Sequence, residues 1–224
     1  MTSERPHNKK RGEEALSKKR WDSLYCSGAE KEWGVVNEHI PEIVQLLARR
    51  GAKTVLDLGC GSGRHVVYLA ERGFQVFGID LSPEGIQKAK QLLVQRSLPA
   101  KLKVESIYRP LPYPDSFFDA VISIHTFHHA RIEDIRKAIS ELQRILKPDG
   151  ILFITVRKRT SKKHRHHFKE IAPHTYVPLE GREKGLIHYL FTKETLQKEF
   201  KGFRIRKVWI DEANYYCLLG ELKS

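Results

Sequence analysis

One short segment near the first quarter of the chain constrains the fold more than any other. It reads VLDLGCGSGR and covers residues 55–64. Apolar and β-branched residues lead into three closely spaced glycines, and a segment of helical period follows. Glycines at a strand-to-helix turn let the backbone bend sharply and approach a ligand closely, while the helix N-terminus presents free N–H groups. The segment therefore predicts an α/β fold with a nucleotide-like ligand at this turn.

Short apolar runs that alternate with helical segments extend the α/β pattern along the chain. Strands are predicted at 54–58, 76–79, 102–104, 118–124 and 151–156. Helices are predicted at 38–50, from Ser82 and Pro83 onward, at 132–146 and from Thr192 to Phe200. The apolar runs at 203–210 and 215–219 are joined by a link too short for a crossover helix. They are predicted to pair as an antiparallel hairpin.

The spacing of glycines and carboxylates selects among nucleotide-like ligands. The dinucleotide-binding pattern G-x-G-x-x-G needs its third glycine at position 64, where this chain has Arg64. Asp57 stands two residues before the first glycine, and its carboxylate suits a cationic amine and repels phosphate. Asp80 ends the second strand, where a carboxylate accepts hydrogen bonds from both hydroxyls of a ribose. An amine together with a ribose that carries no phosphate describes S-adenosylmethionine.

These motifs resemble the class I S-adenosylmethionine-dependent methyltransferases of the type 11-like kind. The resemblance is carried by VLDLGCGSGRH at 55–65, FGIDLSPEGI at 77–86, LPYPDSFFDAVIS at 111–123 and LKPDGILFITV at 146–156. It implies a Rossmann-like, seven-stranded, mostly parallel sheet with an antiparallel C-terminal hairpin and helices on both faces. It also implies an enzyme that transfers a methyl group from S-adenosylmethionine to an acceptor.

The resemblance implies cofactor-binding roles residue by residue. Asp57 and the glycines would hold the methionine part, Asp80 the ribose, and Leu81 would pack on the adenine. Where many members place an Asp that contacts the adenine amine, this chain has Ser106 and Ile107. Adenine recognition then rests on backbone groups or on Ser106, and the two alternatives stay open. The glycines concerned are Gly59, Gly61 and Gly63.

Three histidines, His125, His128 and His129, follow the fourth predicted strand, at the sheet edge where ligands bind in open α/β folds. The sulfonium already activates the methyl group, so positioning of the acceptor supplies much of the rate and a general base is optional. Any one of the three is able to orient the acceptor or remove its proton. The alternative for each is local packing and hydrogen bonding.

Aromatic residues upstream of the glycine turn are candidate acceptor contacts. Trp21, Tyr25 and Trp33 either form a lid over the acceptor or pack an N-terminal helix on the core. Their arrangement is similar to that in tellurite-resistance and thiopurine-type small-molecule methyltransferases. The stretches SIHTFHHA at 123–130 and NYYCLL at 214–219 instead look like the wobble-uridine tRNA methyltransferases.

Residues 157–191 form a long connection after the fifth strand and are predicted to be a basic, substrate-covering loop. Arg157, Tyr176 and Tyr189 are its candidate substrate contacts. Its basic residues suit an RNA backbone, whereas its aromatic residues suit a small molecule. Because no separate RNA-binding module is recognisable, a small-molecule acceptor is preferred over tRNA. A non-catalytic binder of S-adenosylmethionine or RNA is the third alternative.

The formal net charge of +13 is concentrated in two segments. Residues 1–20 hold seven Lys or Arg and three acidic residues, and 156–170 hold seven against one. We expect 1–20 to be a basic N-terminal arm, helical or disordered, and 21–224 to be a single methyltransferase domain. No run is apolar and long enough to cross a bilayer, and the polar N-terminus lacks the apolar core of a signal peptide. No membrane partner and a cytoplasmic location are therefore expected.

No metal site is predicted from the sequence. The three cysteines, Cys26, Cys60 and Cys217, are far apart and in no metal-ligand spacing, so we expect reduced thiols. The histidine-rich run at 164–167 stands among Lys and Arg residues that repel cations, which favours a solvated basic loop.

Overall fold

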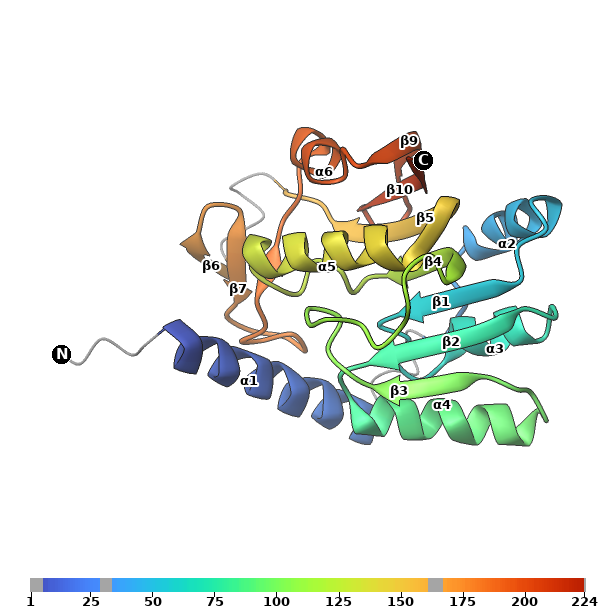
Figure 1. Ribbon diagram of the computed structural model, residues 1–224. Helices are drawn as coiled ribbons and strands as arrows, with labels where there is room; N and C mark the ends of the chain where they lie inside the picture. Colours follow the sequence, from blue (N-terminus) through green and yellow to red (C-terminus); the bar gives the residue numbers. More distant parts are fainter. Residues whose placement is uncertain (1–5, 29–33, 161–166, 224) are drawn as a thin grey trace.

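A computed structural model describes residues 6–28, 34–160 and 167–223 of the chain. A seven-stranded sheet forms its centre, with the strand order β3-β2-β1-β4-β5-β10-β9 (Figure 1). The strands are β1 Thr54–Leu58, β2 Gln75–Asp80, β3 Lys101–Val104, β4 Phe118–Ile124, β5 Leu146–Arg157, β9 Phe203–Ile210 and β10 Tyr215–Leu222. The Rossmann-like sheet and the C-terminal hairpin expected from the sequence are both confirmed.

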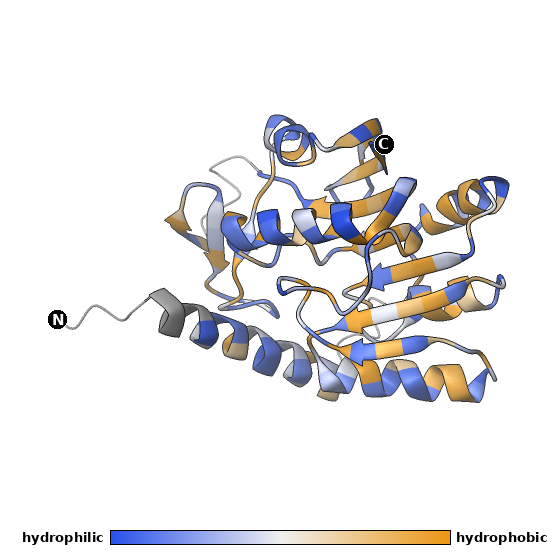
Figure 2. Cartoon of the chain, viewed as in Figure 1, coloured by the Kyte–Doolittle hydropathy of each residue, from blue (hydrophilic) through white to orange (hydrophobic). Residues whose placement is uncertain are grey.

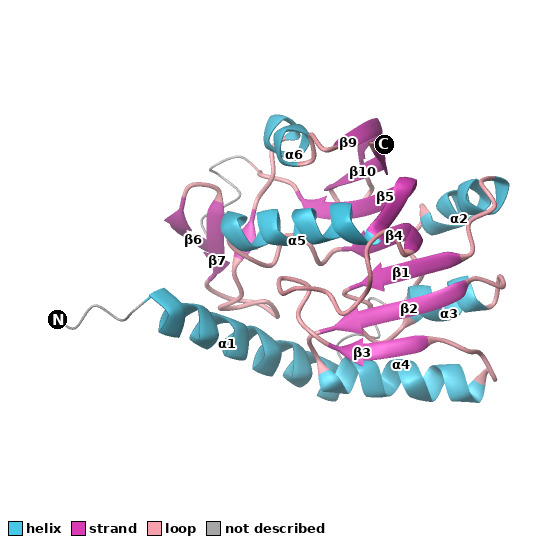
Figure 3. Cartoon of the chain, viewed as in Figure 1, coloured by secondary structure: helices cyan, strands magenta, loops and turns pink. Residues whose placement is uncertain are grey.

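Helices flank the sheet on both faces (Figure 3). Apolar side chains of α2, α3 and α4 share one core with Val55, whereas those of α5 and α6 share another with Leu56. Val55 and Leu56 enter different cores because successive side chains of a strand point to opposite faces. The helices are α1 Pro6–Cys26, α2 Ile40–Arg49, α3 Arg64–Ala70, α4 Pro83–Gln95, α5 Ile132–Ile145 and α6 Lys193–Glu199.

The predicted starts of α4 and α6 are confirmed by their caps. The Ser82 hydroxyl accepts a hydrogen bond from the Gly85 N–H at 3.1 Å, and Pro83 follows in the first turn. At α6 the Thr192 hydroxyl accepts from the Thr195 N–H at 3.2 Å, and the Thr195 hydroxyl accepts from the Thr192 N–H at 2.8 Å. Each cap satisfies helix N–H groups that have no partner within the helix.

Strand direction brings the functional turns together. β1 pairs in parallel with β2 and β4, and β4 pairs in parallel with β5. The segments that follow these strands therefore leave the sheet at one edge. β10 lies antiparallel to both β5 and β9, and the hairpin turn includes Asn214 with a φ of +65°. Figure 2 shows the central strands as mainly apolar, as expected for strands covered on both faces.

The N-terminal region is a helix from Pro6 to Cys26. Of the two states expected for residues 1–20, the described part adopts the helical one, and the expected boundary between residues 20 and 21 falls inside α1. Trp33 lies outside the described residues. None of the helices in the described ranges is both long enough and apolar enough to span a membrane.

The expected covering loop at 157–191 contains secondary structure of its own. A small antiparallel sheet forms from β6 Phe168–Ala172, β7 Thr175–Pro178 and β8 His188–Tyr189. The turn between β6 and β7 includes His174 with a φ of +59°. The two ends of the segment are tied together, because the Phe191 N–H donates to the Arg157 carbonyl at 3.0 Å. Part of the histidine-rich run, 164–166, lies outside the described residues.

Candidate active site

The glycine-rich turn connects β1 to α3 at the edge where β2 and β4 also end. The Gly59 N–H donates a hydrogen bond to the Ile79 carbonyl at 2.8 Å, which joins this turn to β2. Gly59 and Gly61 have φ values of +84° and +53°, in the left-handed region. A β carbon at Gly59 would collide with Thr126, and one at Gly61 with the Tyr25 hydroxyl. Both positions need glycine for backbone conformation and for space.

Asp57 places a carboxyl group under this turn. It is 1% exposed, and neither of its oxygens accepts a hydrogen bond from the described residues. Burial raises the pKa of Asp57 to about 7. His65 Nδ1 lies 3.9 Å away, but burial lowers the pKa of His65 well below its usual value, so this imidazole is uncharged at neutral pH. An ionised carboxylate at this position is costly until a cation or a hydrogen-bond donor reaches it.

Asp80 joins the turns that follow β1 and β2. Its Oδ2 accepts a hydrogen bond from the Gly61 N–H at 2.8 Å, and its Oδ1 accepts one from the Ser82 N–H at 2.8 Å. Burial raises the pKa of Asp80 to about 6, and these two hydrogen bonds limit the rise. A carboxylate has about four acceptor positions, so Asp80 keeps acceptor capacity for a ligand hydroxyl.

A cavity of about 560 Å³ lies beside this turn, within the size range of cofactor sites. It is lined by the segments after β1, β2, β3 and β4 and by α1. The lining includes these residues singled out from the sequence: Gly59, Gly61, Asp80, Leu81, Ser106, Ile107, Trp21, Tyr25, His125 and His129. It does not include Asp57, Gly63, His128, Arg157, Tyr176 or Tyr189.

The first helix contributes more of the cavity wall than its two aromatic residues. Glu13 and Glu14 also line the cavity. Glu13 forms an ion pair with Arg131 at 2.7 Å, and Glu14 forms one with Arg109 at 2.9 Å. The arginines precede α5 and follow β3, so α1 bridges two segments of the sheet edge. Sequence reasoning missed this role, because the charges of α1 suggest a solvated arm.

The C-terminal part of α1 is tied to the start of α4. The Ser82 hydroxyl donates to the Asp22 carboxylate at 2.5 Å, and the Lys88 ammonium donates to the Tyr25 carbonyl at 2.5 Å. Tyr25 is buried, with its hydroxyl close to Gly61. The helix therefore meets both the glycine turn and the turn after β2.

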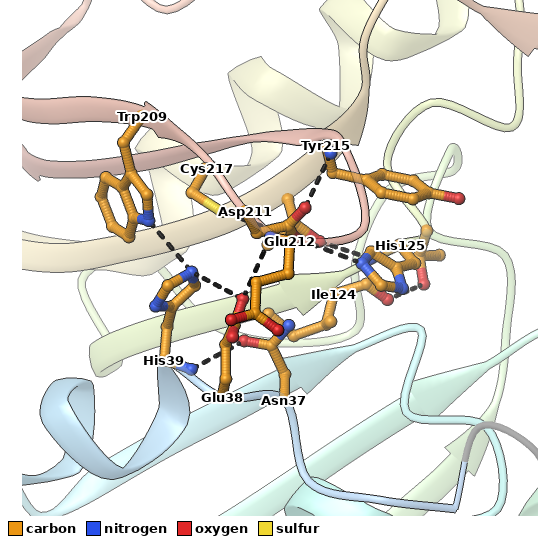
Figure 4. Close-up of polar contacts among 12 residues, drawn as sticks. Asn37, Glu38, His39, Ile124, His125, Trp209, Asp211, Glu212, Tyr215 and Cys217 are labelled. Carbon is orange, nitrogen blue, oxygen red and sulfur yellow. Dashed lines mark hydrogen bonds and ion pairs between the residues drawn. The ribbon is translucent and has the colours of Figure 1, made fainter.

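The ring of His125 lies beside Asp211 and Tyr215 (Figure 4). This histidine has a φ of +56°, and its ring stacks on Tyr215 with 4.0 Å between the centroids. Its Nε2 lies 3.8 Å from Oδ2 of Asp211. Burial alone would raise the pKa of Asp211, but the nearby His125 imidazole and the hydrogen bond from the Tyr215 N–H hold it below its usual value. An ionised Asp211 thus faces an imidazole at the cavity wall. Asp211 was not singled out from the sequence, since an acidic residue in a hairpin turn is usually solvated.

The other two histidines lie side by side, with ring centroids 4.2 Å apart. His128 is fully buried and does not line the cavity, and neither of its ring nitrogens has a hydrogen-bond partner among the described residues. His129 lines the cavity and meets the Trp21 ring edge-on at 5.1 Å. Burial lowers the pKa of both histidines, that of His129 to about 3. Both imidazoles are therefore uncharged at neutral pH.

The wall after β3 is formed by Ser106, Ile107 and Tyr108. Ser106 is buried, and its hydroxyl accepts a hydrogen bond from the Tyr108 N–H at 3.4 Å. The Tyr108 hydroxyl donates to the Thr126 carbonyl at 3.2 Å and so joins this wall to the segment after β4. Tyr108 was not singled out from the sequence, where no motif marks it.

The candidate substrate contacts of residues 157–191 pack within the protein. Arg157 Nη1 pairs with Glu183 at 2.9 Å. Tyr176 and Tyr189 are 2% and 5% exposed, and Tyr189 lies in the core on the α5 side. Glu183, which was not singled out from the sequence, lines the cavity in their place.

Replacement of Asp57 tests how much the buried carboxyl lowers the unfolding free energy. The folded-state pKa of Asp57, about 7, exceeds the usual value of about 3.9, so ligand-free wild type loses stability as pH rises between these values. We expect the gain in unfolding free energy from Asp57→Asn to be larger at about pH 8 than at about pH 5, by roughly 2 kcal/mol. Urea unfolding measures it. Exposed Asp115→Asn is the control, and the opposite pH trend in Asp57→Asn would contradict the assignment.

The contact between the glycine turn and α1 is tested by a pair of glycine substitutions. Gly61→Ala places a β carbon against Tyr25 at a positive φ, whereas Gly73→Ala has a φ of +80° and open space around the new atom. Strain alone costs roughly 1–2 kcal/mol. We expect a larger loss of unfolding free energy in Gly61→Ala, and partial recovery when Tyr25→Phe is added. Equal losses in the two alanine variants, without recovery, would show that α1 does not contact the turn.

Comparison with known proteins finds a methyltransferase domain and methyltransferase relatives. Residues 56–154 match the family model of a methyltransferase domain. The chain is 34% identical over 115 residues to an uncharacterized methyltransferase of Synechocystis sp., a match that covers 51% of this chain and about half, 52%, of that protein. It is 28% identical over 213 residues to an uncharacterized methyltransferase of Geobacillus sp., covering 86% of this chain and 93% of that protein.

Solved structures show the same fold. The 1,6-didemethyltoxoflavin-N1-methyltransferase of Burkholderia thailandensis, solved with 1,6-didemethyltoxoflavin and S-adenosylhomocysteine, aligns with a TM-score of 0.73. The alignment covers 100% of this chain and 93% of that one at 17% identity. Residues 56–154 thus match a methyltransferase domain, and the sheet has the fold of the Burkholderia thailandensis enzyme.

Proposed function

We propose that this methyltransferase acts on a small molecule held between the glycine turn and α1. The cavity is the observation that carries the proposal. Its volume of about 560 Å³ suits a cofactor with a compact acceptor, and α1 closes one side of it. The Burkholderia thailandensis enzyme of the same fold was solved with 1,6-didemethyltoxoflavin and S-adenosylhomocysteine bound, which supports a small-molecule acceptor.

The residues around the turn fit S-adenosylmethionine. The Asp57 carboxyl lies behind the glycine turn rather than on the cavity wall, has no hydrogen-bond partner among the described residues, and favours a cationic amine in the neighbouring cavity. Asp80 lines the cavity with acceptor positions for ribose hydroxyls. Gly59 and Gly61 line the cavity and have positive φ values, so the backbone itself faces the ligand there. When bound, the cofactor supplies a methyl group that its sulfonium has already activated.

His125 is assigned the proton-accepting role at the acceptor. It lines the cavity, Tyr215 restrains its ring, and the Asp211 carboxylate faces its Nε2 at 3.8 Å. A nearby carboxylate favours the imidazolium that forms when a histidine takes up a proton. His129 is assigned to the acceptor wall beside Trp21.

A tRNA acceptor is the second candidate, supported by the basic residues of 156–170. Lys and Arg side chains in such a segment neutralise phosphates, so binding would weaken steeply with salt. The described part of this segment leads into the small sheet β6-β7-β8. A labelled RNA product would decide for this candidate against the small molecule.

The cofactor assignment is tested by calorimetry with S-adenosylmethionine and S-adenosylhomocysteine. Asp80→Ala removes hydrogen bonds to a charged group, worth about 1.5–3 kcal/mol, so we expect both ligands to bind roughly 10–100-fold more weakly. Asp115→Ala, at an exposed carboxylate outside the cavity, is expected to bind as the wild type does. Unchanged affinity in Asp80→Ala would remove the ribose role from this residue.

The acceptor class is tested by transfer of a labelled methyl group into a cell extract that is then separated into RNA, protein and metabolite fractions. We expect label in the metabolite fraction, insensitive to ribonuclease. With the labelled acceptor, His125→Gln should lower kcat by roughly 100-fold and leave cofactor affinity unchanged. Label that ribonuclease removes would establish the RNA candidate, and full activity of His125→Gln would exclude its role as a base.

A further inference from the structure

Three histidines from two distant parts of the chain meet beside the cavity. His128 and His129 lie between β4 and α5, and His188 lies in β8. One ring nitrogen of each lies within 4.8 Å of the others. The centroids of His129 and His188 are 4.6 Å apart, and those of His128 and His188 are 5.6 Å apart. The small sheet makes this cluster, since it returns His188 to the sheet edge.

Each of these imidazoles has a ring nitrogen without a hydrogen-bond partner among the described residues. The His129 Nε2–H donates to the His125 carbonyl at 3.1 Å, which leaves the lone pair on Nδ1, and Nδ1 has no partner. His188 Nε2 lies 3.1 Å from the Glu183 carboxylate, and its Nδ1 has no partner. Neither nitrogen of His128 has one. Buried polar atoms without partners are rare and costly, so three together need an explanation.

The chemistry of the cluster suits a cation. His128 and His188 are buried, His129 lies against both, and an uncharged imidazole is the form that binds metals. The Glu183 carboxylate lies 3.1 Å from Nε2 of His188 and forms an ion pair with Arg157 at 2.9 Å. Glu183 is therefore a carboxylate that orients a histidine, as carboxylates behind metal-binding histidines do.

We propose that His128, His129 and His188 bind one divalent transition-metal ion of the zinc class, with Glu183 as the partner that orients His188. Three nitrogens leave one position of a tetrahedral ion to water or a ligand. Two nitrogens on such an ion lie about 3.3 Å apart, so the rings need to close by a small rotation from their present separation. Arg157, the nearby cation, is paired with Glu183 and partly offset by it.

The position of the ion indicates what it would stabilise. It would join two segments. One is β8, which lies within the covering residues 157–191, and the other is the segment after β4 that carries His125. His129 belongs to both the cluster and the cavity lining, so the ion would lie behind the cavity wall. The proposal departs from the expectation of no metal site, which was based on the spacing of the cysteines and on the Lys and Arg residues around the run at 164–167.

The test uses full-length protein without an affinity tag, stripped with a chelator and carrying Cys26→Ser to remove the exposed thiol. Equilibrium dialysis is expected to show about one Zn²⁺ per chain, and Co²⁺ should give the visible absorption of a tetrahedral site. His188→Gln and His128→Gln should each weaken binding by more than the roughly 10–100-fold that loss of an outer partner costs. Exposed His167→Gln is the matched control and should bind as the parent does.

A second measurement uses the parent protein alone, so it does not require that the histidine variants fold. Zn²⁺, but not Mg²⁺, should raise the melting temperature and slow tryptic cleavage at Arg182 and Lys184. No binding by the parent protein would overturn the proposal, as would an unchanged cobalt spectrum in His188→Gln. Loss of binding in His167→Gln would also overturn it, since an adventitious surface site would then explain the ion.

Discussion

The carboxylate of Asp80 holds the functional edge of this protein together. It accepts one hydrogen bond from the glycine turn, at Gly61, and one from the turn before α4, at Ser82. The Ser82 hydroxyl in turn donates to Asp22 in α1. A single buried side chain thus links two βα turns, and Ser82 connects it to the N-terminal helix. The group assigned to the ligand is also the group that builds the site.

Asp57 shows that such a site lowers the stability of the ligand-free fold. A buried acid with no hydrogen-bond partner among the described residues destabilises the ligand-free fold, and packing elsewhere in the two cores must offset this cost. Binding sites commonly contain groups that are poorly solvated until the ligand arrives, because the contact with the ligand is then stronger. Stability and affinity therefore make opposite demands on this position.

Local patterns were sufficient for most of the fold and for the cofactor turn. Strand composition, the caps at Ser82 and Thr192, and the short hairpin link each depend on neighbours in the sequence, so they could be predicted. Asp57 and Asp80 were found because they keep a set distance from the glycines. Contacts between distant segments carry no such signal. The pairing of Glu13 with Arg131 and the meeting of His188 with His128 depend on how α1 and the small sheet fold back.

The helix α1 encloses the cavity largely through charged contacts near the surface. Its pairs between Glu13 and Arg131 and between Glu14 and Arg109 are partly exposed, unlike the apolar contacts that hold α2 or α5. Dissolved ions screen the first kind of contact and leave the second almost unaffected. Higher ionic strength is therefore expected to weaken these two contacts of α1 more than it weakens the apolar scaffold behind the cavity.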